Sequence, residues 1–151
     1  MALEDDVAKL ARNPVFAALS PDALRLLAFS AESKTFRAGD ILFRRDEPSS
    51  GGFVVMSGSV ALDSAGDGSA SRIFRPPALI GEIALLTETK RPATAIAREP
   101  TSVLRVTQQM FRRVLTEYPE SAERLRQTLA ARLSGFVDEL DRLWSRPQPT
   151  P

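Results

Sequence analysis

A glycine, a glutamate and an arginine lie along one short segment at a spacing that suits an anionic ligand. Gly81 and Glu82 precede a short apolar run, and Arg91 follows, just before Ala93 and Thr94. Glycine lets backbone approach a ligand closely, and N–H groups at the start of a helical turn favour negative charge. A guanidinium offers a planar fork of donors to phosphate oxygens, and a carboxylate accepts hydrogen bonds from sugar hydroxyls. The segment therefore predicts a site for a sugar phosphate.

The elements that must position this segment begin with helix. Residues 3–30 are expected to be helical, and Ser20, Pro21 and Asp22 form a start signal within them. Serine serves as N-cap, proline suits the first helical position, and an acid suits the first turn. Apolar residues then recur at helical spacing, at Leu24, Leu27 and Ala28.

Residues 33–106 change character, because short β-rich runs alternate with Gly, Pro, Asp and Ser turn signals. Many short strands at close spacing are typical of a sandwich or barrel. Gly66–Ser69 is expected to form a hairpin tip, and residues 81–86 a short helix that interrupts the barrel. The expected strands are Lys34–Phe36, Ile41–Phe43, Phe53–Met56, Ser59–Asp63, Arg72–Phe74, Ala93–Ala97 and Ser102–Val106.

Helix returns from residue 107 to 145. Thr107 can cap a short helix, and Pro119 can begin a longer one. The longer helix carries one apolar stripe with spacings of three and four residues. The stripe consists of Leu125, Leu129, Leu133, Phe136, Leu140 and Leu143.

The segment from Gly81 to Ala95 resembles the phosphate-binding cassette of the cyclic nucleotide-binding domain family, which includes Crp/Fnr-type regulators. The runs Phe36–Phe43 and Val54–Val60 resemble that family's entry strands and tight turn. The resemblance covers roughly residues 10–143. It implies a mainly β fold with flanking helices (α+β), a double-stranded β-helix or jelly-roll barrel with N-terminal helices and two C-terminal helices.

The resemblance also implies a domain organisation. A single cyclic nucleotide-binding domain is expected over residues 1–145, followed by a flexible proline-rich tail at 146–151. Within the domain we expect a helical lead-in, a barrel that contains the cassette, and the C-terminal helices. These parts are expected at 1–32, 33–106 with the cassette at 79–95, and 107–145.

The family's site implies a role for each matching residue. Arg91 would pair with the exocyclic phosphate oxygens, and Glu82 would accept from the ribose 2′-hydroxyl. Backbone N–H groups of Gly81, Ile83 and Ala84 would close around the phosphate and sugar. The whole expected ligand-binding set is Gly81, Glu82, Ile83, Ala84, Arg91, Pro92, Ala93 and Thr94.

The chain departs from the family pattern at two positions of the cassette. Ile80 stands where phenylalanine is common, and Pro92 stands where relatives often have Ser, Thr or Ala. Proline has no N–H to offer a phosphate. A side-chain hydroxyl at that position often accompanies cGMP selectivity in relatives, so its absence favours cAMP.

Composition excludes several enzyme classes. The chain has no cysteine and no histidine, so a thiolate nucleophile, a histidine base and a Cys/His metal site are excluded. We therefore expect no catalytic residue, metal or cofactor beyond the nucleotide ligand. A metalloenzyme on a cupin-like barrel is the enzymatic alternative, and the missing histidines argue against it.

Charge and hydropathy bear on location and partners. Net charge is +1, no apolar run approaches membrane-spanning length, and the acidic N-terminus has no signal-peptide character. The protein is expected to be cytoplasmic, without membrane association. Seven residues follow Trp144, so we expect no intrinsic DNA binding.

The long C-terminal helix has three interpretations. It can pair with a second copy as a homodimer, which we favour, or pack only on its own barrel. It can also fold over the site as a lid and offer base contacts. The candidate lid residues are Gln127, Thr128, Arg132 and Trp144. The alternative function is an interaction or dimerisation domain that keeps the fold but has lost the ligand; a protein effector is a possible partner in either case.

Overall fold

The computed structural model describes the backbone of residues 2–64 and 72–144. Side chains are described for residues 3–64 and 72–131, and at 138, 141 and 142. The expected hairpin tip at Gly66–Ser69 and the expected tail at 146–151 lie outside the described residues.

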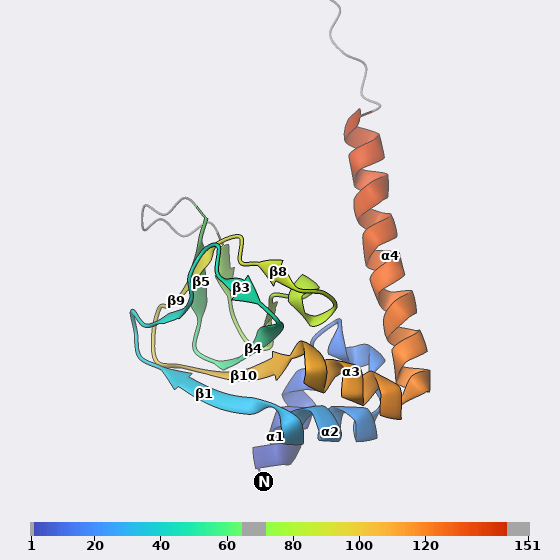
Figure 1. Ribbon diagram of the computed structural model, residues 1–151, viewed down its shortest axis with the longest axis horizontal. Helices are drawn as coiled ribbons and strands as arrows, with labels where there is room; N and C mark the ends of the chain where they lie inside the picture. Colours follow the sequence, from blue (N-terminus) through green and yellow to red (C-terminus); the bar gives the residue numbers. More distant parts are fainter. Residues whose placement is uncertain (1, 65–71, 145–151) are drawn as a thin grey trace, which may run out of the picture.

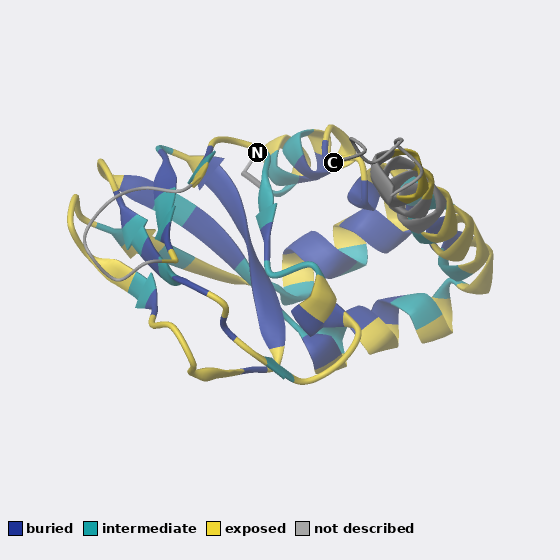
Figure 2. Cartoon of the chain, turned by 90° about the horizontal axis from the view of Figure 1, so that it is seen from above, coloured by how far each residue is buried: buried dark blue, intermediate teal, exposed yellow. Residues whose placement is uncertain are grey.

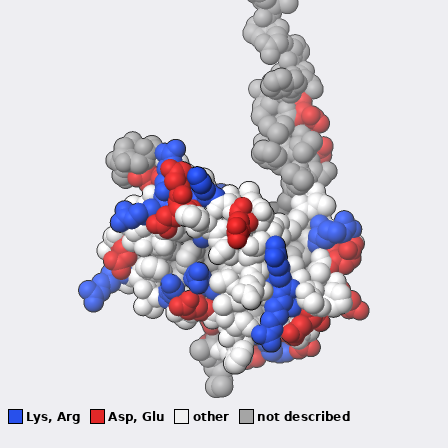
Figure 3. Space-filling model, in the orientation of Figure 1, with Lys and Arg blue, Asp and Glu red and all other residues white. Residues whose placement is uncertain are grey.

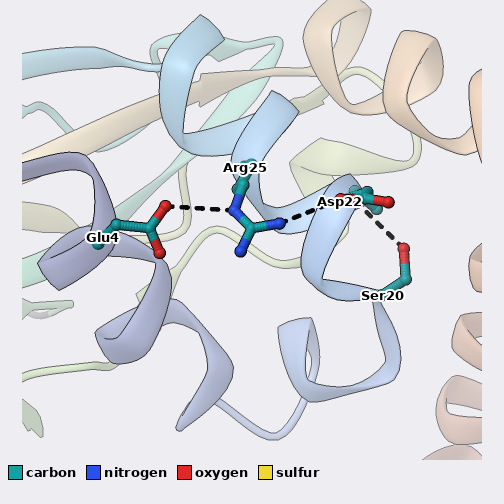
Figure 4. Close-up of polar contacts among 5 residues, drawn as sticks. Glu4, Ser20, Asp22 and Arg25 are labelled. Atoms are coloured by element: carbon teal, nitrogen blue, oxygen red, sulfur yellow. Dashed lines mark hydrogen bonds and ion pairs between the residues drawn. The ribbon is translucent and has the colours of Figure 1, made fainter.

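The N-terminal segment forms two helices and a single 3-10 turn. They are α1 (Ala2–Ala11), η1 (Phe16–Ala18) and α2 (Pro21–Ser30). The expected start signal is confirmed, because Ser20 Oγ accepts a hydrogen bond from Ala23 N at 3.2 Å. Figure 4 shows Arg25 of α2 between Glu4 of α1 and Asp22, at 3.2 and 3.1 Å. The Arg25–Glu4 pair links the two helices, whereas the Arg25–Asp22 pair lies within α2. Both pairs are exposed and contribute little free energy.

In the described part of the chain, ten strands form two four-stranded sheets and one two-stranded ribbon, all antiparallel. The first sheet has the order β1 (Glu32–Phe36), β10 (Thr101–Thr107), β4 (Gly51–Ser57), β7 (Leu79–Ile80). The second has the order β2 (Ile41–Phe43), β9 (Thr94–Ala97), β5 (Val60–Asp63), β6 (Arg72–Phe74). The ribbon pairs β3 (Pro48–Ser49) with β8 (Thr89–Lys90).

Two hydrophobic clusters hold these layers together. One lies between the two sheets, with members from both, such as Phe43 of β2, Phe53 of β4 and Phe74 of β6. The other joins the helices to the first sheet and includes Phe16 and Phe111. Figure 2 shows the buried residues along the inner faces of strands and helices. The expected jelly-roll barrel with flanking helices is therefore confirmed.

All seven expected strands are present, with ends shifted by at most two residues. The sequence did not predict β3, β7 or β8, each only two residues long. A strand of that length shows no alternation, and its existence depends on the partner strand. The expected short helix appears as η2 (Ile83–Leu85).

Two C-terminal helices follow the barrel, α3 (Gln108–Glu117) and α4 (Pro119–Trp144). Thr107 caps α3 as expected, since its Oγ1 accepts from Met110 N at 3.1 Å. Figure 1 shows α4 leaving the helical layer and extending away from the barrel. No helix within the described ranges is long and apolar enough to span a membrane.

The root of α4 is tied to the N-terminal segment by two hydrogen bonds. Ser20 N donates to Ser121 Oγ at 2.9 Å, and Arg124 Nε donates to Ala18 O at 2.9 Å. Leu125 is buried and Leu129 packs against the same cluster. The rest of the stripe lies outside the described side chains, at Leu133, Phe136, Leu140 and Leu143.

Candidate ligand-binding site

The Arg91 side chain is buried inside the barrel, with 6% of its surface exposed. Its backbone is held against the β2–β3 loop, because Arg91 N donates to Glu47 O at 2.9 Å and Asp46 N donates to Arg91 O at 2.8 Å. Its guanidinium lies over the Phe43 ring, 4.2 Å from the centroid, and Nη2 donates to Gly51 O at 2.7 Å. The cation is thus fixed by a ring face and a carbonyl.

This burial makes the positive charge of Arg91 less favourable than it is in water. Desolvation lowers the pKa of Arg91 to about 10, opposed by the nearby Glu47 carboxylate and reinforced by the positive charge of Arg105. Its Nε is buried and has no hydrogen-bond partner within the described part of the chain. A buried cation with an unsatisfied donor is costly unless an anion or acceptor joins it. The site is therefore arranged to accept a negative group.

Gly81 makes room for this guanidinium. Its φ of +87° belongs to the region that only glycine adopts readily. A Cβ at Gly81 would collide with Arg91 Nη1, so a larger residue would displace the cation. Immediately afterwards, Ala84 N donates to Gly81 O at 3.0 Å and closes the turn of η2. The backbone N–H of Ala84, which the sequence assigned to a ligand, is thus used within the turn.

A cavity of about 660 Å³ opens beside the cassette. This volume lies within the range of small-molecule sites. The sequence-predicted residues that line it are Gly81, Glu82, Ile83, Ala84, Arg91, Pro92 and Ala93. Among the described lining residues, three are cations, Arg72, Lys90 and Arg91, and one is a carboxylate, Glu82. On the face drawn in Figure 3, cations and anions are interspersed.

Sequence reasoning missed part of the cavity wall. Arg72 and Phe74 line it from β6, and Asn13 lines it from the loop after α1. Asn13 is buried and joins two segments, since its Oδ1 accepts from Val15 N at 2.9 Å and its Nδ2 donates to Pro77 O at 2.8 Å. The alternation along β6 could have placed Arg72 and Phe74 on one face. No local signal connects Asn13 to the cassette.

Several expected contact residues lie elsewhere. Thr94 does not line the cavity, and its Oγ1 accepts a hydrogen bond from Arg45 N at 3.0 Å. Gln127 and Thr128 do not line it either, because they bond within α4, to Glu123 Oε1 and Arg124 O. Arg132 and Trp144, the two further candidates, are not among the residues whose side chains the structure describes.

Comparison with known proteins agrees with this geometry. The family model described as "Cyclic nucleotide-binding domain" matches residues 33–118, which include the cassette and all of the barrel except the first residue of β1. The chain belongs to the cyclic nucleotide-binding domain family. A solved structure of the N-terminal domain of a transcriptional regulator from Streptomyces coelicolor is similar to it, with 32% identity and a TM-score of 0.80. That similarity covers 87% of this chain and 94% of the other.

Two curated relatives place the same domain in different proteins. The cyclic AMP receptor protein of Thermus thermophilus is 29% identical over 87% of this chain and 62% of its own length. Lysophospholipase nte1 of Neurospora crassa is 27% identical over 83% of this chain, but over only 8% of its own length. The chain therefore spans less than two thirds of the length of either relative.

Replacement of Arg91 by methionine should leave the unliganded fold about as stable as the wild type, or more stable. The thioether can pack on Phe43, the buried cation disappears, and Gly51 O keeps its hydrogen bond from Ser49 Oγ at 3.0 Å. We expect the melting temperature of Arg91→Met to lie within about 3 °C of the wild type or above it, since the lost cation–π contact is worth about 0.5–2 kcal/mol.

The matched control is Arg98→Met, because Arg98 is exposed and does not line the cavity. Calorimetric melting of both variants without ligand measures the effect. A loss of about 8 °C or more in Arg91→Met alone would contradict this account and make Arg91 a structural residue.

Proposed function

We propose that this domain is a non-catalytic regulatory module that binds a cyclic nucleotide in the cavity beside Arg91. The observation that carries the proposal is the buried guanidinium, held by Phe43 and Gly51, with an unsatisfied Nε. A cyclic phosphate would supply the missing negative charge. Membership of the family and the positive lining of the cavity support the same ligand class.

The proposed roles follow the chemistry of the wall. Arg91 pairs with the exocyclic phosphate oxygens, and the turn that starts at Gly81 lies next to its Nη1. Glu82 lies half-buried at the start of η2 and lines the cavity, where its carboxylate can accept from a ribose hydroxyl. A charged hydrogen bond contributes on the order of 1.5–3 kcal/mol, so Arg91 carries most of the affinity.

The proposed preference is for cAMP over cGMP. Pro92 lines the cavity directly after Arg91 and brings neither a hydroxyl nor an N–H. The 2-amino group of guanine therefore has no side-chain hydroxyl to bond at this position. Adenine has no 2-amino group, so its binding is not weakened by the missing hydroxyl. The missing N–H also weakens the hold on either cyclic phosphate.

Saturation with cAMP should stabilise the protein. At one hundred times its dissociation constant a ligand adds about 2.7 kcal/mol of stability, which corresponds to roughly 5–10 °C for a domain of this size. We expect a smaller shift with cGMP at the same concentration. Calorimetric titration should show at least tenfold weaker cAMP binding by Arg91→Met, while the Arg98→Met control binds as the wild type does.

The alternative is a domain that keeps the fold but has lost the nucleotide. Two observations favour it: Pro92 has no N–H for the phosphate, and Arg91 already donates to Gly51 O. The absence of any shift with either nucleotide, in wild-type protein that melts cooperatively, would support this alternative and contradict the proposed function.

We further propose that ligand binding is transmitted through the C-terminal helices. Leu85 of the cassette is 1% exposed and belongs to the same buried cluster as Phe111 of α3 and Leu125 of α4. Movement of the turn around a phosphate therefore changes the packing surface of both helices. A ligand shifts the helices only if it binds the two arrangements with different affinity.

Hydrogen exchange should report this coupling. We expect saturating cAMP to change the protection of α3 and of the first turns of α4, in addition to the cassette itself. Arg91→Met treated in the same way supplies the control, because it should show no ligand-dependent change. Identical protection of residues 107–144 with and without ligand, in protein whose cassette does respond, would refute transmission through these helices.

We also propose that α4 pairs with a second copy of itself in a homodimer. The apolar stripe continues at residues 133, 136, 140 and 143, where the helix has left the helical layer (Figure 1). An apolar stripe of this length is typical of a helix–helix interface.

Light scattering tests this pairing. The wild type should show twice the chain mass of 16.5 kDa, and Leu140→Asp should shift it to the mass of one chain. Arg142→Asp, on an exposed position of the same turn, should leave the mass unchanged. A wild-type mass of one chain at high protein concentration would rule the dimer out.

A further inference from the structure

The carbonyl of Gly51 accepts hydrogen bonds from two side chains that come from the β3–β8 ribbon. Arg91 Nη2 donates to it at 2.7 Å, and Ser49 Oγ donates to it at 3.0 Å. Ser49 belongs to β3, which pairs with β8, and Arg91 directly follows β8. Ser49 is 4% exposed, so its hydroxyl is held away from bulk water and makes this bond inside the protein.

The main-chain pairing of β4 leaves the Gly51 carbonyl to these side chains. Gln108 N donates to Ser50 O at 2.6 Å, and antiparallel pairs alternate between hydrogen-bonded and non-hydrogen-bonded positions. The Gly51 carbonyl therefore points away from β10. On its other side, the described part of β7 pairs with Phe53 and Val54 and does not reach Gly51. Because Gly51 is buried, loss of both side-chain donors would leave its carbonyl without a partner, away from water.

A phosphate at Arg91 would use the same donor that bonds Gly51. Arg91 Nε is buried and has no partner in the described part of the chain. The N–H groups of Nε and Nη2 lie on the same side of a guanidinium, so a phosphate that binds Nε in a bidentate pair takes Nη2 as its second donor. A charged acceptor forms the stronger hydrogen bond. The bond from Arg91 Nη2 to Gly51 O is therefore weakened when a phosphate binds.

We propose that Ser49 is a positioning residue that keeps Gly51 O hydrogen-bonded when a cyclic phosphate takes Arg91, an inference that rests on the proposed function. The hydroxyl bond is present with and without ligand, so the movement of Arg91 leaves no buried acceptor unpaired. Ser49 is absent from the described lining of the cavity. It thus raises the affinity for the ligand by its effect on Gly51 and Arg91, without a contact of its own.

A double-mutant cycle without ligand tests whether the two donors share this carbonyl. Ser49→Ala in the wild type leaves Arg91 on Gly51 O, and we expect the melting temperature to fall by about 3 °C or less. The same change in Arg91→Met removes the second donor as well, and there we expect a fall of about 6 °C or more.

Ser50→Ala is the matched control for the cycle, because Ser50 is the next residue and its side chain is exposed. Its effect on the melting temperature should be small and equal in both backgrounds. Equal falls for Ser49→Ala in the wild type and in Arg91→Met would show that the two donors act independently, and would overturn the inference.

Calorimetric titration with cAMP tests the effect of Ser49 on the ligand. We expect Ser49→Ala to bind cAMP about tenfold more weakly than the wild type, because the ligand now leaves Gly51 O unpaired. Ser49→Thr keeps the hydroxyl and should bind within about threefold of the wild type, and Ser50→Ala should bind as the wild type does. The same loss in Ser49→Thr as in Ser49→Ala would contradict a role for the hydroxyl.

The outcomes separate this inference from the proposed function. Weaker cAMP binding by Arg91→Met together with unchanged binding by Ser49→Ala would leave the cyclic nucleotide site in place and overturn the role of Ser49. If the folded wild type bound neither cAMP nor cGMP, both the proposed function and this inference would fall, whatever the melting cycle showed. Melting curves of each variant confirm that the titrated protein is folded.

Discussion

The Arg91 guanidinium packs closely against the backbone of two glycines, and the geometry of the site depends on this close packing. Gly51 supplies the carbonyl at 2.7 Å, Gly81 leaves the space beside Nη1, and Phe43 supplies a ring face. These residues come from β4, from the turn before η2 and from β2. One buried cation therefore joins both sheets to the cassette, and it places a positive charge in the wall of the cavity.

The helical layer, unlike the site around Arg91, is held together mainly by apolar packing. Its cohesion comes from apolar packing among Phe16, Leu85 and Phe111, supplemented by directed bonds at the root of α4. The members of that cluster are apolar side chains. The cassette belongs to both regions, because Arg91 faces the barrel and Leu85 faces the helices. This double membership is the physical basis of the proposed coupling between a ligand and the C-terminal helices.

The amino-acid sequence predicted the features that depend on neighbouring residues. The N-caps Ser20 and Thr107 and the seven longer strands carry local signals. So do the expected cassette residues that line the cavity, which run from Gly81 to Ala93 and do not include the equally expected Thr94. The bond from Arg91 to Gly51 O could not be predicted, because it joins residues forty positions apart and depends on the closeness of two strands. The same holds for Arg72, whose place opposite the cassette is set by barrel closure. Tertiary contacts, rather than secondary-structure propensity, determine where the Arg91 and Arg72 side chains lie.

The long α4 helix has a mechanical consequence. It comprises 26 residues and is fixed by hydrogen bonds near its start, at Ser121 and Arg124. A helix of that length extends about 39 Å at 1.5 Å per residue. A rotation of ten degrees about its root would therefore carry its far end through roughly 7 Å. A change in the packing of one side chain next to Leu125 can thus move the far end of α4 far enough to alter its contact with another protein.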